Sequence, residues 1–338
     1  MTPGKNQKQQ PDLFAPCLAG LLYQALVRGQ AGYAARSGLL ALPLSALALA
    51  AAMWLLGRCW RWTEGKLLRA LLCALLAYSS ALELLRMWRL LCGVYPGAVT
   101  LLGVCLVILG PVIYLRRPPA LTQTAHVLLA LLALACLLLL VCTAPRLDAA
   151  NLQSNLALPQ ALRGQLVLAP ELLLYVCCGG RKDTVRHGAG AALRLALGFT
   201  GADAALHLLL ELFFGAALQR RQNPLHAVLR CGALSVFTRL EWLQLLLWCM
   251  LLSLRLALYL YAAVELAGGQ SGKAADNTVG LDRYPLYFAG LFLLCFALRG
   301  VDLAAAGAVQ SAAYWLFAAL VAVAGGVKWC FKRPKSAC

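Results

Sequence analysis

Ten apolar windows follow one another along this chain, and only short connectors rich in charge, glycine or proline separate them. A helix rises about 1.5 Å per residue, so roughly 20 apolar residues cross the hydrocarbon layer of a bilayer, which is about 30 Å thick. Charged residues make up only 13% of the sequence, against about a quarter in soluble domains. The sequence therefore predicts an integral membrane protein.

Helices are expected in these windows because lipid cannot satisfy unpaired backbone N–H and C=O groups, and because the Leu/Ala-rich sequence lacks the alternating pattern of a barrel strand. The prediction is an all-α polytopic fold of about ten transmembrane helices. A single transmembrane domain covers 12–330, between a polar tail, 1–11, and a basic tail, 331–338. The predicted spans lie at 12–27, 38–57, 67–91, 95–115, 122–144, 164–179, 188–218, 234–267, 284–299 and 305–330.

The formal charge of +17 would suggest a nucleic-acid partner in a soluble protein. Here most Lys and Arg residues stand in the connectors, where they set topology and contact anionic headgroups, so no nucleic-acid partner is expected. The connectors on the side of the two termini carry more of these residues than the other connectors. Both termini are therefore expected in the cytoplasm.

Signals for catalytic, metal or cofactor chemistry are missing from the sequence. The fourteen cysteines are scattered, apart from Cys177 and Cys178, and form no CxxC pair, which favours a packing role. There is no GxSxG, HExxH, phosphate-binding loop or dinucleotide fingerprint. We expect neither an enzyme nor a metal or cofactor site.

Two spans contain residues that interrupt helices. Span 1 is short and carries Pro16 and Gly20, while span 6 contains Pro170 and is followed by two glycines. Secondary transporters use such breaks, in corresponding helices of two repeats, to build a binding site. Spans 1 and 6 are five apart, which predicts a five-plus-five inverted repeat of the LeuT-like kind with helices 1 and 6 broken. The polar segment before span 6, 145–163, is expected to be an outer interfacial loop with a short helix.

The second half of the chain resembles the spore germination permease family, the B subunits of nutrient germinant receptors. The match is clearest over about 145–267 and rests on a polar loop, a Pro-Glu pair at the start of span 6, a basic exit and an aromatic stretch in span 8. The residues that carry it are Asp148 to Leu152, Pro170-Glu171-Leu172-Leu173, Arg181-Lys182, Pro224, Arg230, Arg239-Leu240-Glu241, Trp248 and Tyr259-Leu260-Tyr261.

This resemblance implies the fold of amino acid/polyamine/organocation transporters, in agreement with the predicted helix breaks. It also implies a germinant-sensing subunit in the inner membrane of a spore, which binds an amino acid between helices 1, 3, 6 and 8. Its expected partners are the other receptor subunits, a membrane-anchored protein with a soluble domain and a lipoprotein.

Ionisable residues inside spans usually face the bundle interior, so they are the first candidates for a site. Glu171, beside the break at Pro170, could meet an ammonium group or pair with an arginine. Arg255, deep in span 8, could pair with Glu171, hold a ligand carboxylate or extend to the headgroups. Tyr78 and Ser79 offer hydroxyls in span 3, where the alternative role is helix packing. With Gly20 of span 1 and Pro170 of span 6, these residues form the predicted ligand site.

Other polar residues are given structural roles. Glu83 and Arg86 stand at i, i+3 spacing and are expected to neutralise each other near the outer surface. Asp203, His207 and Glu211 share one helix face, predicted to point to the bundle interior or an outer vestibule rather than to bind metal. Arg239 and Glu241 are expected to form a structural lock at the start of span 8.

Two other functions stay open beside germinant sensing. A secondary transporter for amino acids or amines would use the same fold and site, and would carry its substrate across the membrane without partner subunits. A structural membrane protein without a ligand would tolerate the loss of the intramembrane polar side chains.

Overall fold

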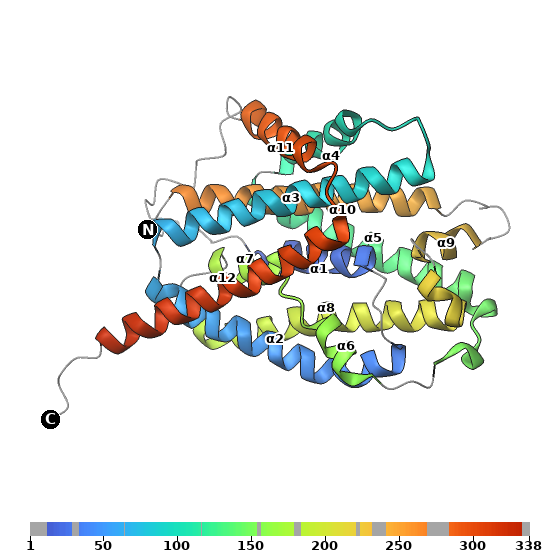
Figure 1. Ribbon diagram of the computed structural model, residues 1–338, viewed down its shortest axis with the longest axis horizontal. Helices are drawn as coiled ribbons and strands as arrows, with labels where there is room; N and C mark the ends of the chain where they lie inside the picture. Colours follow the sequence, from blue (N-terminus) through green and yellow to red (C-terminus); the bar gives the residue numbers. More distant parts are fainter. Residues whose placement is uncertain are drawn as a thin grey trace, which may run out of the picture.

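The computed structural model describes most of the chain as helix (Figure 1), and the described residues contain no strand. The predicted all-α fold is therefore confirmed. The structure describes residues 12–28, 34–63, 65–115, 117–153, 157–178, 184–220, 224–231, 241–268 and 284–332.

Each predicted span contains a helix. The elements are α1 (Phe14–Arg28), α2 (Ala35–Thr63), α3 (Lys66–Val94), α4 (Leu101–Leu115), α5 (Pro118–Thr143), the 3-10 turns η1 (Ala144–Arg146) and η2 (Ala149–Asn151), α6 (Leu158–Gln165), α7 (Pro170–Cys178), α8 (Thr184–Phe214), η3 (Gly215–Arg220), α9 (Pro224–Cys231), α10 (Glu241–Gly268), α11 (Tyr284–Leu298) and α12 (Leu303–Lys332).

The number of helices that can cross a membrane is smaller than predicted. Among the described residues, six helices are long and apolar enough, or seven if the bent pair α6 and α7 counts as one span. The helices α1, α4 and α11 have 15 residues each, fewer than the roughly 20 that a full crossing needs. The protein is thus a multi-pass helical membrane protein, and the predicted ten spans are not reached by length.

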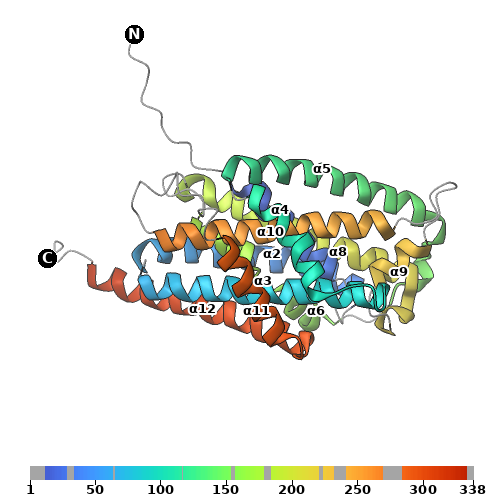
Figure 2. The ribbon, with the colours of Figure 1, turned by 90° about the horizontal axis from the view of Figure 1, so that it is seen from above.

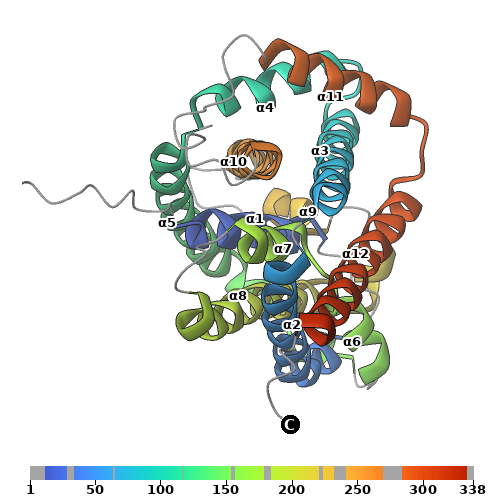
Figure 3. The ribbon, with the colours of Figure 1, turned by 90° about the vertical axis from the view of Figure 1, so that its left-hand side faces the viewer.

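Helix α10 lies inside the bundle and is surrounded by α1, α3, α4, α5 and α7 (Figures 2 and 3). Of its most apolar 18-residue stretch, 78% is buried, whereas only 22% of the corresponding stretch of α5 is buried. Helices α2 and α8 pack together on the other side of α1, and α12 crosses α2 and α3. An ionisable side chain within the buried stretch of α10 is therefore held away from lipid by the surrounding helices.

The outer faces of the peripheral helices carry large apolar side chains. Val107 on α4, Leu137 on α5 and Val323 on α12 are 64%, 58% and 66% exposed. Soluble monomers rarely leave so wide an apolar surface in water, but in a bilayer these side chains contact lipid tails. This surface agrees with the membrane location predicted from the sequence.

The predicted interruption of span 1 is wrong within the described residues, because α1 continues without a break from Phe14 to Arg28. Pro16 falls in the first turn, where the backbone N–H that proline lacks would have had no partner inside the helix. Gly20 lies inside the helix, and its role is one of packing. A Cβ atom at this position would approach the Cγ of Glu171 to 2.8 Å.

The predicted interruption of span 6 is confirmed. Helices α6 and α7 meet at a bend of 49°, and α7 begins at Pro170 and ends at Cys178, as expected. The first part of the predicted span is the end of α6 and a non-helical link of four residues, 166–169. Helix α6 itself starts inside the predicted outer loop 145–163, which also contains η1 and η2.

Several predictions concern residues outside those that the structure describes. They are the tail 1–11, residues 333–338 of the C-terminal tail, the basic exit at Arg181 and Lys182, and the lock formed by Arg239 with the side chain of Glu241. In the described part of the C-terminal tail, α12 continues to Lys332.

Candidate functional site

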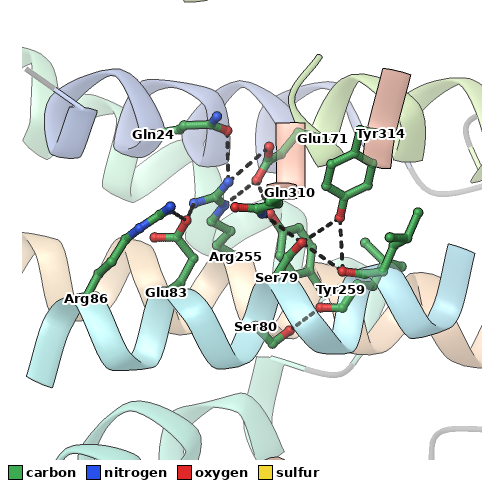
Figure 4. Close-up of polar contacts among 12 residues, drawn as sticks. Gln24, Ser79, Ser80, Glu83, Arg86, Glu171, Arg255, Tyr259, Gln310 and Tyr314 are labelled. Carbon is green, nitrogen blue, oxygen red and sulfur yellow. Dashed lines mark hydrogen bonds and ion pairs between the residues drawn. The ribbon is translucent and has the colours of Figure 1, made fainter. Parts of the chain in front are cut away.

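Glu171 and Arg255 form an ion pair at the centre of the bundle (Figure 4). The guanidinium Nε of Arg255 donates to Oε1 of Glu171, and Nη2 lies 3.4 Å from Oε2. Both side chains are buried, with 0% and 1% exposed. The predicted pairing across helices is therefore confirmed, and Arg255 does not extend to the headgroups.

The start of α7 places the Glu171 carboxylate. Pro170 is the first residue of this helix and Glu171 the second, and the unpaired N–H groups and dipole of a helix N-terminus favour a negative charge there. On the other side, the bare Cα of Gly20 lets α1 approach the carboxylate. The break and the glycine together make room for a glutamate among closely packed helices.

Two side chains outside the predicted set complete the surroundings of the pair. Gln24 Oε1 accepts from Nη2 of Arg255 at 2.9 Å, and the Tyr259 hydroxyl donates to Oε1 of Glu171 at 2.7 Å. The rings of Tyr23 and Tyr259 each lie 5.5 Å from the guanidinium carbon, within the range of cation–π attraction. The pair is thus held by hydrogen bonds and aromatic faces as well as by charge.

A second ion pair joins this one from α3. Arg86 Nη1 lies 2.6 Å from Glu83 Oε1, so the expected neutralisation at i, i+3 spacing is confirmed. The same carboxylate oxygen lies 3.1 Å from Nη1 of Arg255, and Glu83 is only 2% exposed. Glu83 therefore belongs to the central network rather than only to a local pair. The two carboxylates and two guanidiniums have formal charges that cancel.

A cluster of neutral polar groups lies beside the charged network and connects α3 with α12 (Figure 4). The oxygens of Ser79 and Tyr314 are 2.6 Å apart, and Gln310 Nε2 donates to Ser79 Oγ at 2.8 Å. All three side chains are buried. Helix α12 therefore takes part in the candidate site, which the sequence prediction did not include.

The structure brings together residues from all four helices of the predicted site. Glu171, Arg255, Gly20 and Ser79 come from α7, α10, α1 and α3, and they lie in or against the polar network. Tyr78 is half-buried, and it is not one of the residues labelled in the network of Figure 4.

The sequence contained signals for part of what was missed. Tyr259 stands one helical turn after Arg255, and Gln24 is an amide within an otherwise apolar span. Such residues face inward for the same reason as the charged ones. Gln310 is likewise an amide in an apolar span, but only the fold shows that α12 lies next to α3 and that Gln310 and Tyr314 reach Ser79.

The stripe on α8 has a structural use at one end of the bundle. Glu211 is 2% exposed, and its carboxylate accepts from the backbone N–H of Ala35 at 2.5 Å and of Gln153 at 2.6 Å. It thus binds the first residue of α2 and the polar segment that follows η2. His207 is buried as well, in agreement with a stripe that faces the interior.

Comparisons with known proteins leave the family open. No model of a known protein family matches this chain, and no curated protein matches its sequence. The resemblance to spore germination permeases therefore stays a prediction, and the function is argued from the geometry of the site.

Proposed function

We propose that the protein is a membrane-embedded receptor for a small zwitterion, an amino acid, and that it serves as the germinant-sensing subunit of a spore nutrient receptor. The observation that carries the proposal is the buried pair of Glu171 and Arg255 next to a helix break. The resemblance of the second half of the chain to spore germination permeases supplies the biological context.

The charges of the site favour a ligand with both signs. Removing one partner of a buried ion pair costs about 3–5 kcal/mol, because the other charge is left uncompensated. An ammonium group could take the place of Arg255 against Glu171, while a carboxylate received both arms of the guanidinium. An amino acid offers both groups at once. A simple anion would leave Glu171 without a countercharge, and a simple cation would leave Arg255 to share Glu83 with Arg86.

Ligand entry requires a second arrangement of the bundle. Glu171 and Arg255 are fully covered by protein in this structure, so a ligand reaches them only when helices separate. A ligand shifts such an equilibrium only by its different affinity for the two states. In the proposed receptor the ligand-bound arrangement is the one that partner subunits recognise.

The proposal includes a fold, a location and partners. The helix found in each of the ten predicted windows is compatible with a five-plus-five inverted repeat in which the short helices cross with the help of neighbouring protein. The proposed location is the spore inner membrane, with both termini in the cytoplasm. The proposed partners are a subunit with a soluble domain and a lipoprotein.

Thermal stabilisation of the detergent-purified protein by a panel of amino acids, nucleosides and sugars tests the ligand. We expect one amino acid to raise the unfolding temperature, and Glu171→Gln to abolish this shift. Glu265→Gln is the matched control, because Glu265 is an exposed carboxylate on α10. If no compound stabilises the protein, or if the shift persists in Glu171→Gln, the proposed site is wrong.

A secondary amino-acid transporter is the second candidate, favoured by the helix break at a buried carboxylate, which is typical of transporter sites. Uptake of a labelled amino acid into liposomes that contain only this protein separates the two functions. Uptake without partners favours transport, whereas binding without uptake favours sensing. A purely structural role predicts neither.

A further inference from the structure

The break between α6 and α7 leaves the carbonyl oxygen of Leu166 without a helical partner. In a continuous helix this oxygen would accept from the N–H four residues later, but that residue is Pro170, which has no N–H. The indole Nε1 of Trp315, on α12, donates to the oxygen at 3.2 Å. A side chain far away in the sequence thus replaces the donor that proline lacks.

The rest of the break is a tight turn. The N–H of Val167 donates to the carbonyl of Gln165 at 2.8 Å, and Leu166 between them has φ −76° and ψ 57°, the conformation of an inverse γ-turn. The N–H of Leu172 then donates to the carbonyl of Ala169 at 3.1 Å. With so little free chain, a shift of the Leu166 carbonyl is passed to the first turn of α7, which carries Glu171.

Trp315 is itself fixed relative to the polar network. Its neighbour Tyr314 contacts Ser79 on α3, and Gln310, about one turn earlier, donates to the same hydroxyl. Gln310 and Tyr314 of α12 therefore bind α3, and Trp315, the next residue, binds the break between α6 and α7. This helix thus links the break to α3.

We propose that Trp315 is the positioning residue of the candidate site. Its indole N–H holds the α6–α7 break in the bend that brings Glu171 to Arg255, although it touches neither residue in the contacts described. The inference rests on the proposed function only in treating Glu171 as a ligand group. The role of Trp315 in shaping the break can be measured without any ligand.

The experiment is hydrogen exchange, followed by mass spectrometry, on the full chain in lipid nanodiscs without ligand. Trp315→Phe keeps an aromatic ring and removes the N–H. We expect the amides of residues 167–169, 171 and 172 to exchange about tenfold faster, as loss of one hydrogen bond allows. Trp88→Phe is the matched control, because Trp88 Nε1 is buried and has no hydrogen-bond partner in the described structure. In the control, these amides should exchange at the wild-type rate.

Pro170→Ala separates the proposed hydrogen-bond role of Trp315 from a general packing role. Alanine restores an N–H that can bond to Leu166, so Trp315→Phe should change exchange little in this background. If Trp315→Phe alone does not fold, the double variant is expected to fold and to exchange as Pro170→Ala does.

Four results would overturn the inference: wild-type exchange in folded Trp315→Phe, an equal increase in Trp88→Phe, an increase undiminished by Pro170→Ala, or a double variant that also fails to fold. Because no ligand is present, failure of the proposed receptor function leaves this outcome unaffected.

Discussion

At the scale of single residues, the site depends on the space beside α7 as much as on the charges. Glu171 and Arg255 were predicted from their positions inside apolar spans, since an isolated charge there is too costly to face lipid. The neutral groups that hold them, such as Gln24 and Tyr259, also stand in apolar spans, but only the packing of the helices shows which charge each of them contacts. The sequence therefore predicts which charged residues are buried, whereas the side chains that contact them depend on how the helices pack.

Gly20→Ala should disturb the ion pair without removing any polar atom. The new methyl group would lie 2.8 Å from Cγ of Glu171, so the carboxylate or α1 must move, and we expect a lower unfolding temperature. Gly201→Ala is the control, because nothing lies within 4 Å of its Cβ position and alanine favours the helix. Equal unfolding temperatures for both variants in a thermal scan would contradict the close contact.

Removal of the charges of Glu171 and Arg255 together should lower the free energy of unfolding by less than the sum of the two single losses. Arg255→Gln is expected to destabilise the protein by about 3–5 kcal/mol, because it leaves the buried charge of Glu171 alone. Glu171→Gln should cost less, because Arg255 keeps its contact with Glu83. The double variant should lose less than the sum of the two. Additive losses in denaturant titrations would indicate that the pair does not act as a unit.

At the scale of helices, the two predicted breaks had different outcomes for one physical reason. A proline interrupts a helix only where its missing N–H would have had a partner. Pro16 stands in a first turn, where no partner is needed, and Pro170 stands four residues after a carbonyl that needs one. Both spans contain a proline, and the two outcomes differ because the proline stands at a different place relative to the start of the helix. Sequence patterns predict helix starts poorly.

Glu211 should stabilise the two segments that it joins, the start of α2 and the segment around η2. Glu211→Gln replaces a carboxylate that accepts two backbone hydrogen bonds with an amide that can offer one oxygen, and hydrogen bonds to charged groups contribute about 1.5–3 kcal/mol each. We expect faster hydrogen exchange at residues 149–153 and at the start of α2. Unchanged exchange there, with Glu265→Gln as the reference, would show that other contacts suffice.

At the scale of the whole molecule, the apolar windows predicted the helices well and the membrane crossings less well. Hydropathy marks where a helix is apolar, but α4 and α11 contain only 15 residues each. How far such a helix reaches into the bilayer depends on its neighbours rather than on its own sequence. The central place of α10 likewise follows from packing and could not be deduced from its composition.

The exposed apolar surface predicts which helices meet lipid. A lipophilic photoreactive probe in nanodiscs should label peptides of α5 strongly and peptides of α10 weakly, because their most apolar stretches are 22% and 78% buried. Labelling is measured by mass spectrometry after digestion. Equal labelling of the two helices would mean that α10 is not enclosed as described.

The cancelling charges of the central network have a consequence for a protein in an energised membrane. Moving one elementary charge through a potential of 100 mV changes the free energy by about 2.3 kcal/mol. Glu83, Arg86, Glu171 and Arg255 together carry no net formal charge, so helices that move them as a group do almost no electrical work. A rearrangement that moves these four residues together is thereby little affected by changes in membrane voltage.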